Sequence, residues 1–170
     1  MTQLDLAPLA ADRRRAYVLS SAIRPALDEL PPLPRPERAE QLLLTIAGVE
    51  SGWLHRRQMG DGPARGLWQF ERGGGVAGVL QHRATAALAA AALRRRQIPA
   101  APDAAWRALE HDDVLAAIFA RLLLLSDQAP LPGDVVAGRE VYLRTWRPGK
   151  PCSAAKWWET WSLAAAEGGR

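Results

Sequence analysis

A glutamate stands at the end of an apolar helical pattern in residues 37–50, ERAEQLLLTIAGVE. The apolar residues of this segment have helical rather than alternating spacing. Ala47, Ile46 and Leu43 stand three, four and seven positions before Glu50, so the carboxyl group shares the buried face of the expected helix. Partial burial disfavours the charged carboxylate and raises its pKa, which lets a glutamic acid keep a proton near neutral pH and donate it to a leaving oxygen. Glu50 is therefore the candidate general acid.

A glycine-rich loop and a second motif follow this helix. Ser51 comes directly after Glu50, and the sequence GLWQ at residues 66–69 begins sixteen residues after that glutamate. Together they resemble lysozyme-like lytic transglycosylases, in which a catalytic Glu-Ser pair ends a helix and a Gly-Leu-Met-Gln motif follows a short loop. Trp68 stands here in place of the methionine. Without the second motif, an exposed glutamate at a helix end would be the better interpretation.

The resemblance covers about residues 42–70 and is only architectural elsewhere. It implies a lysozyme-like fold and cleavage of the β-1,4 bond between N-acetylmuramic acid and N-acetylglucosamine in peptidoglycan, and it implies no cofactor. Glu50 matches the general acid/base of that family, and Gly66 and Gln69 match the two ends of its second motif. The residues expected at the substrate cleft are Ser51, Trp53, Gly66, Trp68, Gln69 and Tyr142.

A second carboxylate would decide the reaction type. Glycoside hydrolases usually pair a general acid with a base or a nucleophile across the bond, whereas transglycosylases similar to this chain use a single acid. Asp61 in the loop and Glu71 just after the second motif are the candidates. Each is equally well explained as a solvated loop charge. Hydrolysis and transglycosylation therefore both stay open.

The C-terminal part is rich in tryptophan. The family has a tyrosine late in the domain that lines the cleft near the acid, and Tyr142 is the candidate, although the usual Ala-Tyr-Asn context is missing. The tryptophans here that are able to stack on sugar rings are Trp146, Trp157, Trp158 and Trp161. Trp157 and Trp161 are four residues apart and are expected to share a buried helix face, with Trp158 exposed. The two tryptophans of the loop are therefore the stronger candidates for the cleft.

The histidines do not predict a metal site. His55, His82 and His111 lack metal-site spacing, and the chain has no HExxH pattern. Ser51 as a nucleophile would need a base, for which His55 is the only local choice, and no Gly-x-Ser-x-Gly elbow is present. Neither zinc chemistry nor a serine nucleophile is expected.

The elements that must position these residues are helices, and the expected fold is mainly α. Helices are expected over residues 11–30, 37–50, 76–97, 104–110, 112–127, 134–146 and 154–166, with a kink at Pro25 and N-caps at Asp103 and Asp112. Segment 51–75 reads as loop with room for a small β-hairpin. We expect one lysozyme-like domain over residues 1–170, with a helix and a proline-rich connector in residues 1–36 and a catalytic core in residues 37–170.

The positive charge of the chain supports rival interpretations. The net charge is +4 and the pI is about 10, and arginines cluster at Arg13–Arg15 and at Arg94–Arg96. An arginine-rich helical protein that binds nucleic acid is the main rival, and a phage structural component with an inactive lysozyme-like domain is another. Nucleic-acid binding does not require the pair of Glu50 and GLWQ. Peptidoglycan is therefore the expected partner, with no sequence-specific nucleic acid.

Composition also bears on the compartment. Cys152 is the only cysteine, so no intramolecular disulfide is expected. Charges interrupt the N-terminal stretch as they would not in a signal peptide, and the apolar run 114–125 is short of the ~20 residues that a membrane span needs. We expect a monomer that is made in the bacterial cytoplasm and reaches the cell wall by lysis-related export or from a phage particle.

Overall fold

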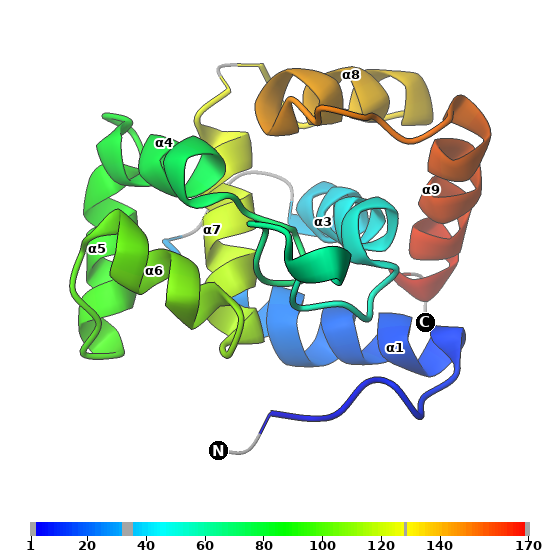
Figure 1. Cartoon of the computed structure of the whole chain (residues 1–170). Helices are drawn as coiled ribbons and strands as arrows, with labels where there is room; N and C mark the ends of the chain where they lie inside the picture. The colour runs from blue at the N-terminus through cyan, green and yellow to red at the C-terminus, as the bar shows by residue number, and fades with distance from the viewer. Residues whose placement is uncertain (1–2, 32–35, 128, 169–170) are drawn as a thin grey trace.

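Helix α7 (Asp113–Leu125) is the apolar centre of the fold. The computed structural model describes residues 3–31, 36–127 and 129–168, and these residues are mainly helical. Eleven of the thirteen residues of α7 are buried, as expected for a helix that is apolar all round. Asp112 caps its first turn by accepting a hydrogen bond from Leu115 N at 2.8 Å, which confirms the predicted N-cap. The other helices pack around α7 in two groups (Figure 1).

The N-terminal helices form one continuous helical stretch beneath this centre. It consists of α1 (Ala11–Tyr17), the π-helical η1 (Val18–Ile23) and α2 (Arg24–Glu29). Pro25 has no N–H to continue the α-helical ladder, and the wider π register directly precedes it, with Arg24 N donating to Leu19 O. The predicted helix is thus present over residues 11–29. Most of the predicted connector Pro31–Pro36 lies outside the described residues.

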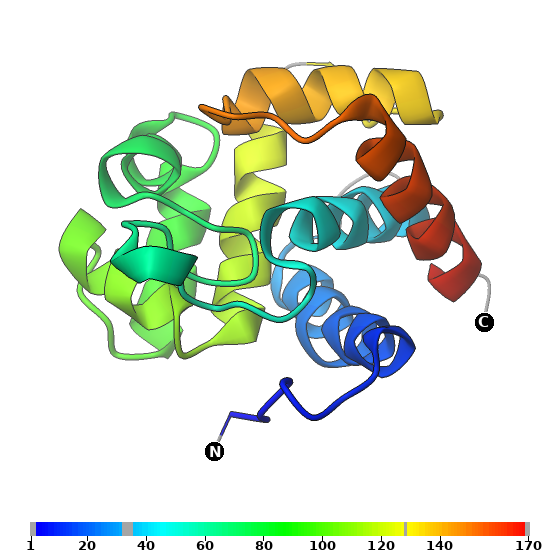
Figure 2. The ribbon, with the colours of Figure 1, turned by 45° about the vertical axis from the view of Figure 1, so that its right-hand side comes forward.

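Helix α3 (Pro36–Ser51) confirms the helix predicted over residues 37–50. It packs against α9 (Ala154–Gly168), η1 and α7. Gly48 lies where α3 approaches α9, and a Cβ there would collide with the Trp53 ring and the Thr160 methyl group. Glycine is therefore required for this close contact. In Figure 2, α3 lies between the N-terminal helices and α8 (Val135–Trp146), which packs against α7 and α9.

A second group of helices lies on the other side of α7. It contains η3 (Arg72–Val76), α4 (Ala77–Gln81), α5 (Ala86–Arg95) and α6 (Pro102–Leu109). The single helix predicted over residues 76–97 is wrong, because the chain turns between α4 and α5. Buried Thr85 stabilises that turn by donating its hydroxyl to Val79 O at 2.7 Å. Asp103 does not cap α6 either; it lies inside the first turn, and the N-cap position is Ala101.

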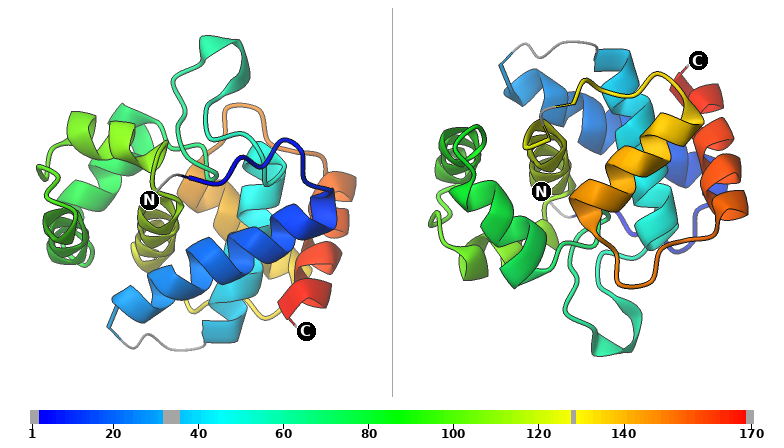
Figure 3. Two further views of the ribbon diagram at one scale, coloured as in Figure 1. Left: turned by 90° about the horizontal axis from the view of Figure 1, so that it is seen from below. Right: turned by 90° about the horizontal axis from the view of Figure 1, so that it is seen from above.

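The loop after α3 contains no β-hairpin among the described residues. The segment in which a small β-hairpin was predicted instead contains two isolated bridges, Arg57 with Arg65 and Arg65 with Phe70. It also contains the short 3-10 turn η2 (Met59–Asp61). Arg65 and Phe70 exchange both backbone hydrogen bonds, which closes a tight turn instead of extending a ladder. The part of the loop around η2 projects from the body of the molecule (Figure 3).

Membrane spanning receives little support from the helices. In residues 3–31, 36–127 and 129–168, none of the helices taken singly has the length and apolar character to cross a bilayer. The stretches Arg72–Gln81 and Ala86–Arg95 reach that threshold only as a pair bent by 103°.

The close contact at Gly48 gives a stability prediction. We expect Gly48→Ala to lower the free energy of unfolding by about 1–3 kcal/mol, the usual cost of forcing a methyl group into a packed interface. Gly78→Ala in α4 is the matched control, because no atom lies within 4 Å of its Cβ position and alanine favours helix there by roughly 0.5–1 kcal/mol. Urea denaturation measures both variants. Equal stability of the two would contradict the packing of α3 on α9.

Candidate active site

Glu50 lies at the C-terminal end of α3 and borders an open cleft. The glutamate is half-buried. The helix ends at Ser51, and Gly52 with its φ of +64° then turns the chain away. The cleft has a volume of about 1100 Å³. Its walls come from the loop after α3, from η3 and α4, and from the end of α8 with the chain that follows it. Glu50 thus lies in the wall of this cleft.

Tyr142 of α8 donates a hydrogen bond from its hydroxyl to Glu50 Oε1 at 2.7 Å. The tyrosine ring is buried and stacks on Trp157, with ring centroids 5.1 Å apart. Because the ring is buried and packs against both Trp157 and Trp146, it holds the carboxyl group in one orientation. The structure thus brings together two of the predicted residues that are 92 positions apart. Tyr142 is absent from the walls of the large cleft but borders a smaller pocket that Glu50 also lines.

The surroundings of Glu50 favour its protonated form. Burial raises its pKa above the ordinary value of 4.5, while the Tyr142 hydroxyl and the Lys156 charge act in the opposite direction. Lys156 Nζ is held nearby by Val49 O at 3.1 Å. Since Tyr142 occupies Oε1, the proton is free to reside on Oε2, for which no protein partner is found among the described residues. This arrangement suits proton donation to a group in the cleft.

The GLWQ motif fastens the loop rather than lining the cleft along its whole length. Gly66 has a φ of +74°, and a Cβ there would lie 2.8 Å from Leu109 O, so this position requires glycine. Gln69 does border the cleft, and its side-chain amide donates to His55 O and Gly66 O at 3.1 and 2.9 Å. Gln69 therefore shapes the wall and holds both ends of the loop together.

Trp53 and Trp68 do not line the cleft, so their assignment as cleft residues was wrong. Trp68 is fully buried and donates its indole N–H to Leu43 O at 2.9 Å. Trp53 is 7 % exposed and donates to Leu44 O at 2.8 Å. The loop folds back on α3, and the two large rings gain more from burial than from solvent.

Ser51 is likewise a structural residue. Its side chain is buried, and its hydroxyl donates to Ala47 O at 2.9 Å, one turn earlier in α3. The expectation that Ser51 lines the substrate cleft is therefore wrong. Its hydroxyl is used within the helix that carries Glu50.

Trp146 is the tryptophan that borders the cleft. It is half-buried, packs against Phe70 with ring centroids 6.0 Å apart, and donates its indole N–H to Trp68 O at 3.1 Å. Trp157 and Trp161 pack together in α9, and Trp158 is 51 % exposed, as predicted. Trp146 was predicted only as one of four C-terminal tryptophans able to stack on sugar rings, because its position near the loop depends on how α8 packs.

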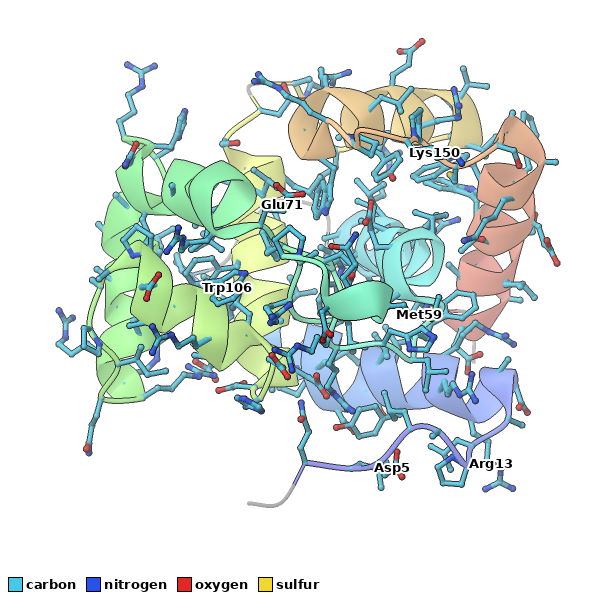
Figure 4. The ribbon with its side chains drawn as sticks, viewed as in Figure 1. Asp5, Arg13, Met59, Glu71, Trp106 and Lys150 are labelled. Atoms are coloured by element: carbon cyan, nitrogen blue, oxygen red, sulfur yellow. The ribbon has the colours of Figure 1, made fainter. Side chains whose placement is uncertain are left out.

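The candidate second carboxylates have different positions. Glu71 is exposed and borders the cleft, whereas Asp61 is absent from its walls and lies on the projecting loop (Figures 3 and 4). The assignment of Asp61 to the site is therefore wrong. Asp127, which the sequence did not single out, also borders the cleft but forms an ion pair with Arg144 at 2.7 Å. Glu71 is thus the remaining predicted partner for Glu50.

An ion pair anchors the loop after α3 to the core helix α7. Arg56 makes two hydrogen bonds of 2.8 and 2.7 Å to Asp113, which fixes the start of the loop to α7.

His55 and His82 both border the cleft. Among the residues that the structure describes, no group of three His, Cys, Asp or Glu side chains is placed to hold a metal ion.

Three of the six arginines in the two clusters, namely Arg15, Arg95 and Arg96, form ion pairs within the protein. Arg96 pairs with Glu29 and Asp112, and Arg95 pairs with the same Glu29. In the N-terminal cluster, Arg15 lies 3.5 Å from Glu167 and Arg14 donates to backbone carbonyl groups. These contacts reduce the charge that each cluster presents to phosphates.

The raised pKa of Glu50 links folding stability to pH. Because the folded protein binds this proton more tightly than the unfolded chain, the stabilisation is fully present below about pH 4.5 and is lost as the pH rises through the raised pKa. Glu50→Gln has no titrating carboxyl group at this position, so its stability does not fall over this pH range for that reason. We expect its advantage in the free energy of unfolding to grow from pH 4 to pH 8, as measured by urea denaturation. A pH-independent difference would contradict a raised pKa.

Tyr142→Phe tests the hydrogen bond from the other side. The ring and its stacking on Trp157 are kept, but the donor that lowers the pKa of Glu50 is lost. We expect the pKa of Glu50 to rise further, which a ¹³C NMR titration of labelled glutamate would measure. An unchanged or lower pKa would show that the tyrosine hydroxyl does not bind the carboxylate.

Comparison with protein-family models, curated proteins and solved structures finds no match for this chain. A functional conclusion therefore depends on the geometry of the site and the motifs that form it.

Proposed function

We propose that the protein cleaves β-1,4 glycosidic bonds of peptidoglycan, with Glu50 as the general acid and base. The observation that carries the proposal is a half-buried carboxyl group at the wall of an open cleft, with one oxygen fixed by Tyr142 and the other free. A lysozyme-like arrangement of the helices around α3 is part of the same proposal. A volume of about 1100 Å³ has room for several sugar rings.

The chemistry follows from the orientation of the carboxyl group. Glu50 Oε2 protonates the oxygen of the bond between the two sugars, and the sugar then develops positive charge at its anomeric carbon. The resulting carboxylate is able to take a proton from the attacking hydroxyl. Where that hydroxyl belongs to the same muramic acid residue, the product is an anhydro sugar; where it belongs to water, the product is a reducing sugar.

The remaining carboxylates favour the single-acid reaction. Asp127 is neutralised by its ion pair with Arg144. Glu71, two residues after Gln69, is exposed to solvent. Neither forms a hydrogen bond with Glu50 in the described part of the chain. We therefore propose transglycosylation rather than hydrolysis. The ion pairs of Arg15, Arg95 and Arg96 reduce the charge that the nucleic-acid rival would need.

Glu50→Gln is the first test of this proposal. The amide keeps the size of the side chain and the acceptor for Tyr142, but it lacks the acidic proton of a carboxylic acid. We expect the rate of peptidoglycan solubilisation to fall by at least ~100-fold, the scale of losing a general acid. Mass spectrometry of the wild-type products should find anhydromuropeptides, which are one water lighter than reducing muropeptides. Parental activity in a folded Glu50→Gln variant would remove Glu50 from the mechanism.

Glu71→Gln is the matched control for the reaction type. If Glu50 acts alone, this variant should keep its rate within about threefold, because an exposed carboxylate outside the reaction contributes little. A loss on the scale of Glu50→Gln, together with reducing muropeptides from the wild type, would instead indicate a hydrolase with two carboxylates.

A further inference from the structure

A second, smaller pocket lies behind Glu50. It has a volume of about 410 Å³ and is formed by the end of α3, by Tyr142, and by the segment from Pro148 to Lys156 that joins α8 to α9. Glu50, Pro148 and Lys150 border both this pocket and the large cleft. The two pockets are therefore adjacent, with Glu50 in the wall of each.

The small pocket is positively charged. Lys150 and Lys156 are the only lysines of the chain, and both border it. Neither forms an ion pair with a carboxylate of the described residues. Lys156 donates to Val49 O and keeps two further N–H groups, and Glu50 is the only acidic residue in the wall. Figure 4 shows Lys150 on the chain between α8 and α9.

The start of α9 adds to this positive character. Ser153 borders the pocket and caps the helix, since its hydroxyl accepts a hydrogen bond from Lys156 N at 3.2 Å. Helix α9 has 15 residues, and the N-terminal end of such a helix attracts negative charge. Arg139 of α8 is not in the pocket wall but lies next to the same segment, because its guanidinium donates to Cys152 O at 3.4 Å. Cationic groups thus come from α8, from α9 and from the chain between them.

We propose that this pocket binds a carboxylate of the peptide that is attached to the muramic acid of the substrate. The assignment of the anion rests on the proposed function, because peptidoglycan carries such peptides on alternate sugars of the chain that would lie in the cleft. Lysine ammonium groups bind a carboxylate or a phosphate by the same charge-assisted hydrogen bonds. The pocket therefore selects glycan strands that still bear their acidic peptides.

Binding is measured first, without turnover. The probes are N-acetylmuramoyl-L-alanyl-D-glutamate, its neutral diamide, and inorganic phosphate, each titrated calorimetrically into the Glu50→Gln protein. We expect the diamide to bind at least tenfold more weakly than the dicarboxylate, and the dicarboxylate to slow the reaction of Cys152 with a thiol reagent. Cys152 is half-buried in the pocket wall and is the only cysteine. Equal affinity for dicarboxylate and diamide would overturn the proposal, as would protection by phosphate alone, which would indicate a free-anion site.

Lys150 is the residue to change, since it is exposed and makes no hydrogen bond among those of the described residues. We expect Lys150→Gln to weaken dicarboxylate binding about tenfold, the effect of one charge-assisted contact, and to leave the diamide unchanged. Lys150→Arg should restore binding. Arg94→Gln removes one exposed charge elsewhere and is the matched control. A Lys150→Gln protein that binds the dicarboxylate like its parent would overturn the proposal.

Turnover separates this proposal from the proposed function. We expect the otherwise unchanged enzyme to cleave intact peptidoglycan at least fivefold faster than strands stripped of their peptides, and Lys150→Gln to lose that preference. Equal rates on both substrates would overturn the peptide subsite while the proposed function stands. If the enzyme cleaved neither intact peptidoglycan nor the stripped strands, the proposed function would be refuted. The calorimetric comparison would still decide whether the pocket binds the peptide carboxylate.

Discussion

The hydrogen bonds of Trp68 hold together the parts of the molecule that form the cleft. Its indole N–H binds Leu43 O of α3, and its own carbonyl accepts the indole N–H of Trp146 from α8. The loop after α3 is thereby fixed between two helices that are far apart in sequence. Tyr142 lies one turn before Trp146 in α8 and reaches Glu50. The position of Tyr142 against the carboxyl group thus depends on the same packing that buries Trp68.

The partial burial of the Glu50 carboxyl group has an energetic cost. Desolvation disfavours the charged form of Glu50, and the Tyr142 hydroxyl and Lys156 compensate only in part, so the net direction of the pKa is upward. A protein under selection for stability alone would replace the glutamate by an apolar residue or by glutamine. The charged form of Glu50 therefore costs folding free energy.

The sequence predicted local features better than tertiary ones. The helical spacing of residues 37–50 and the capping aspartate at 112 depend on neighbours within a few positions, and both were confirmed. The turn between α4 and α5 was missed because it depends on one buried hydroxyl, that of Thr85. Trp53 and Trp68 were placed in the cleft because a loop tryptophan reads as exposed until its packing partner is known.

The contact between Tyr142 and Glu50 could be expected from the family resemblance but not from spacing, since 92 residues separate the two. No pattern in the sequence joined Lys150 and Lys156 to the acid, because their common wall forms only where the chain between α8 and α9 passes the end of α3. Contacts of this kind are set by how helices pack, and a single sequence gives no direct signal for them.

The two sides of Glu50 are therefore electrostatically coupled. Lys156 lowers the pKa of the carboxyl group from the side of the small pocket, while the same carboxyl group also borders the large cleft. An anion bound between the lysines cancels part of their positive charge and adds a negative charge close to the carboxyl group. Both changes disfavour the ionised form of Glu50. In the reaction that we propose, a peptide carboxylate in the pocket would then help to keep Glu50 protonated until the glycosidic oxygen takes the proton, so that peptide recognition and activation of the acid would be coupled.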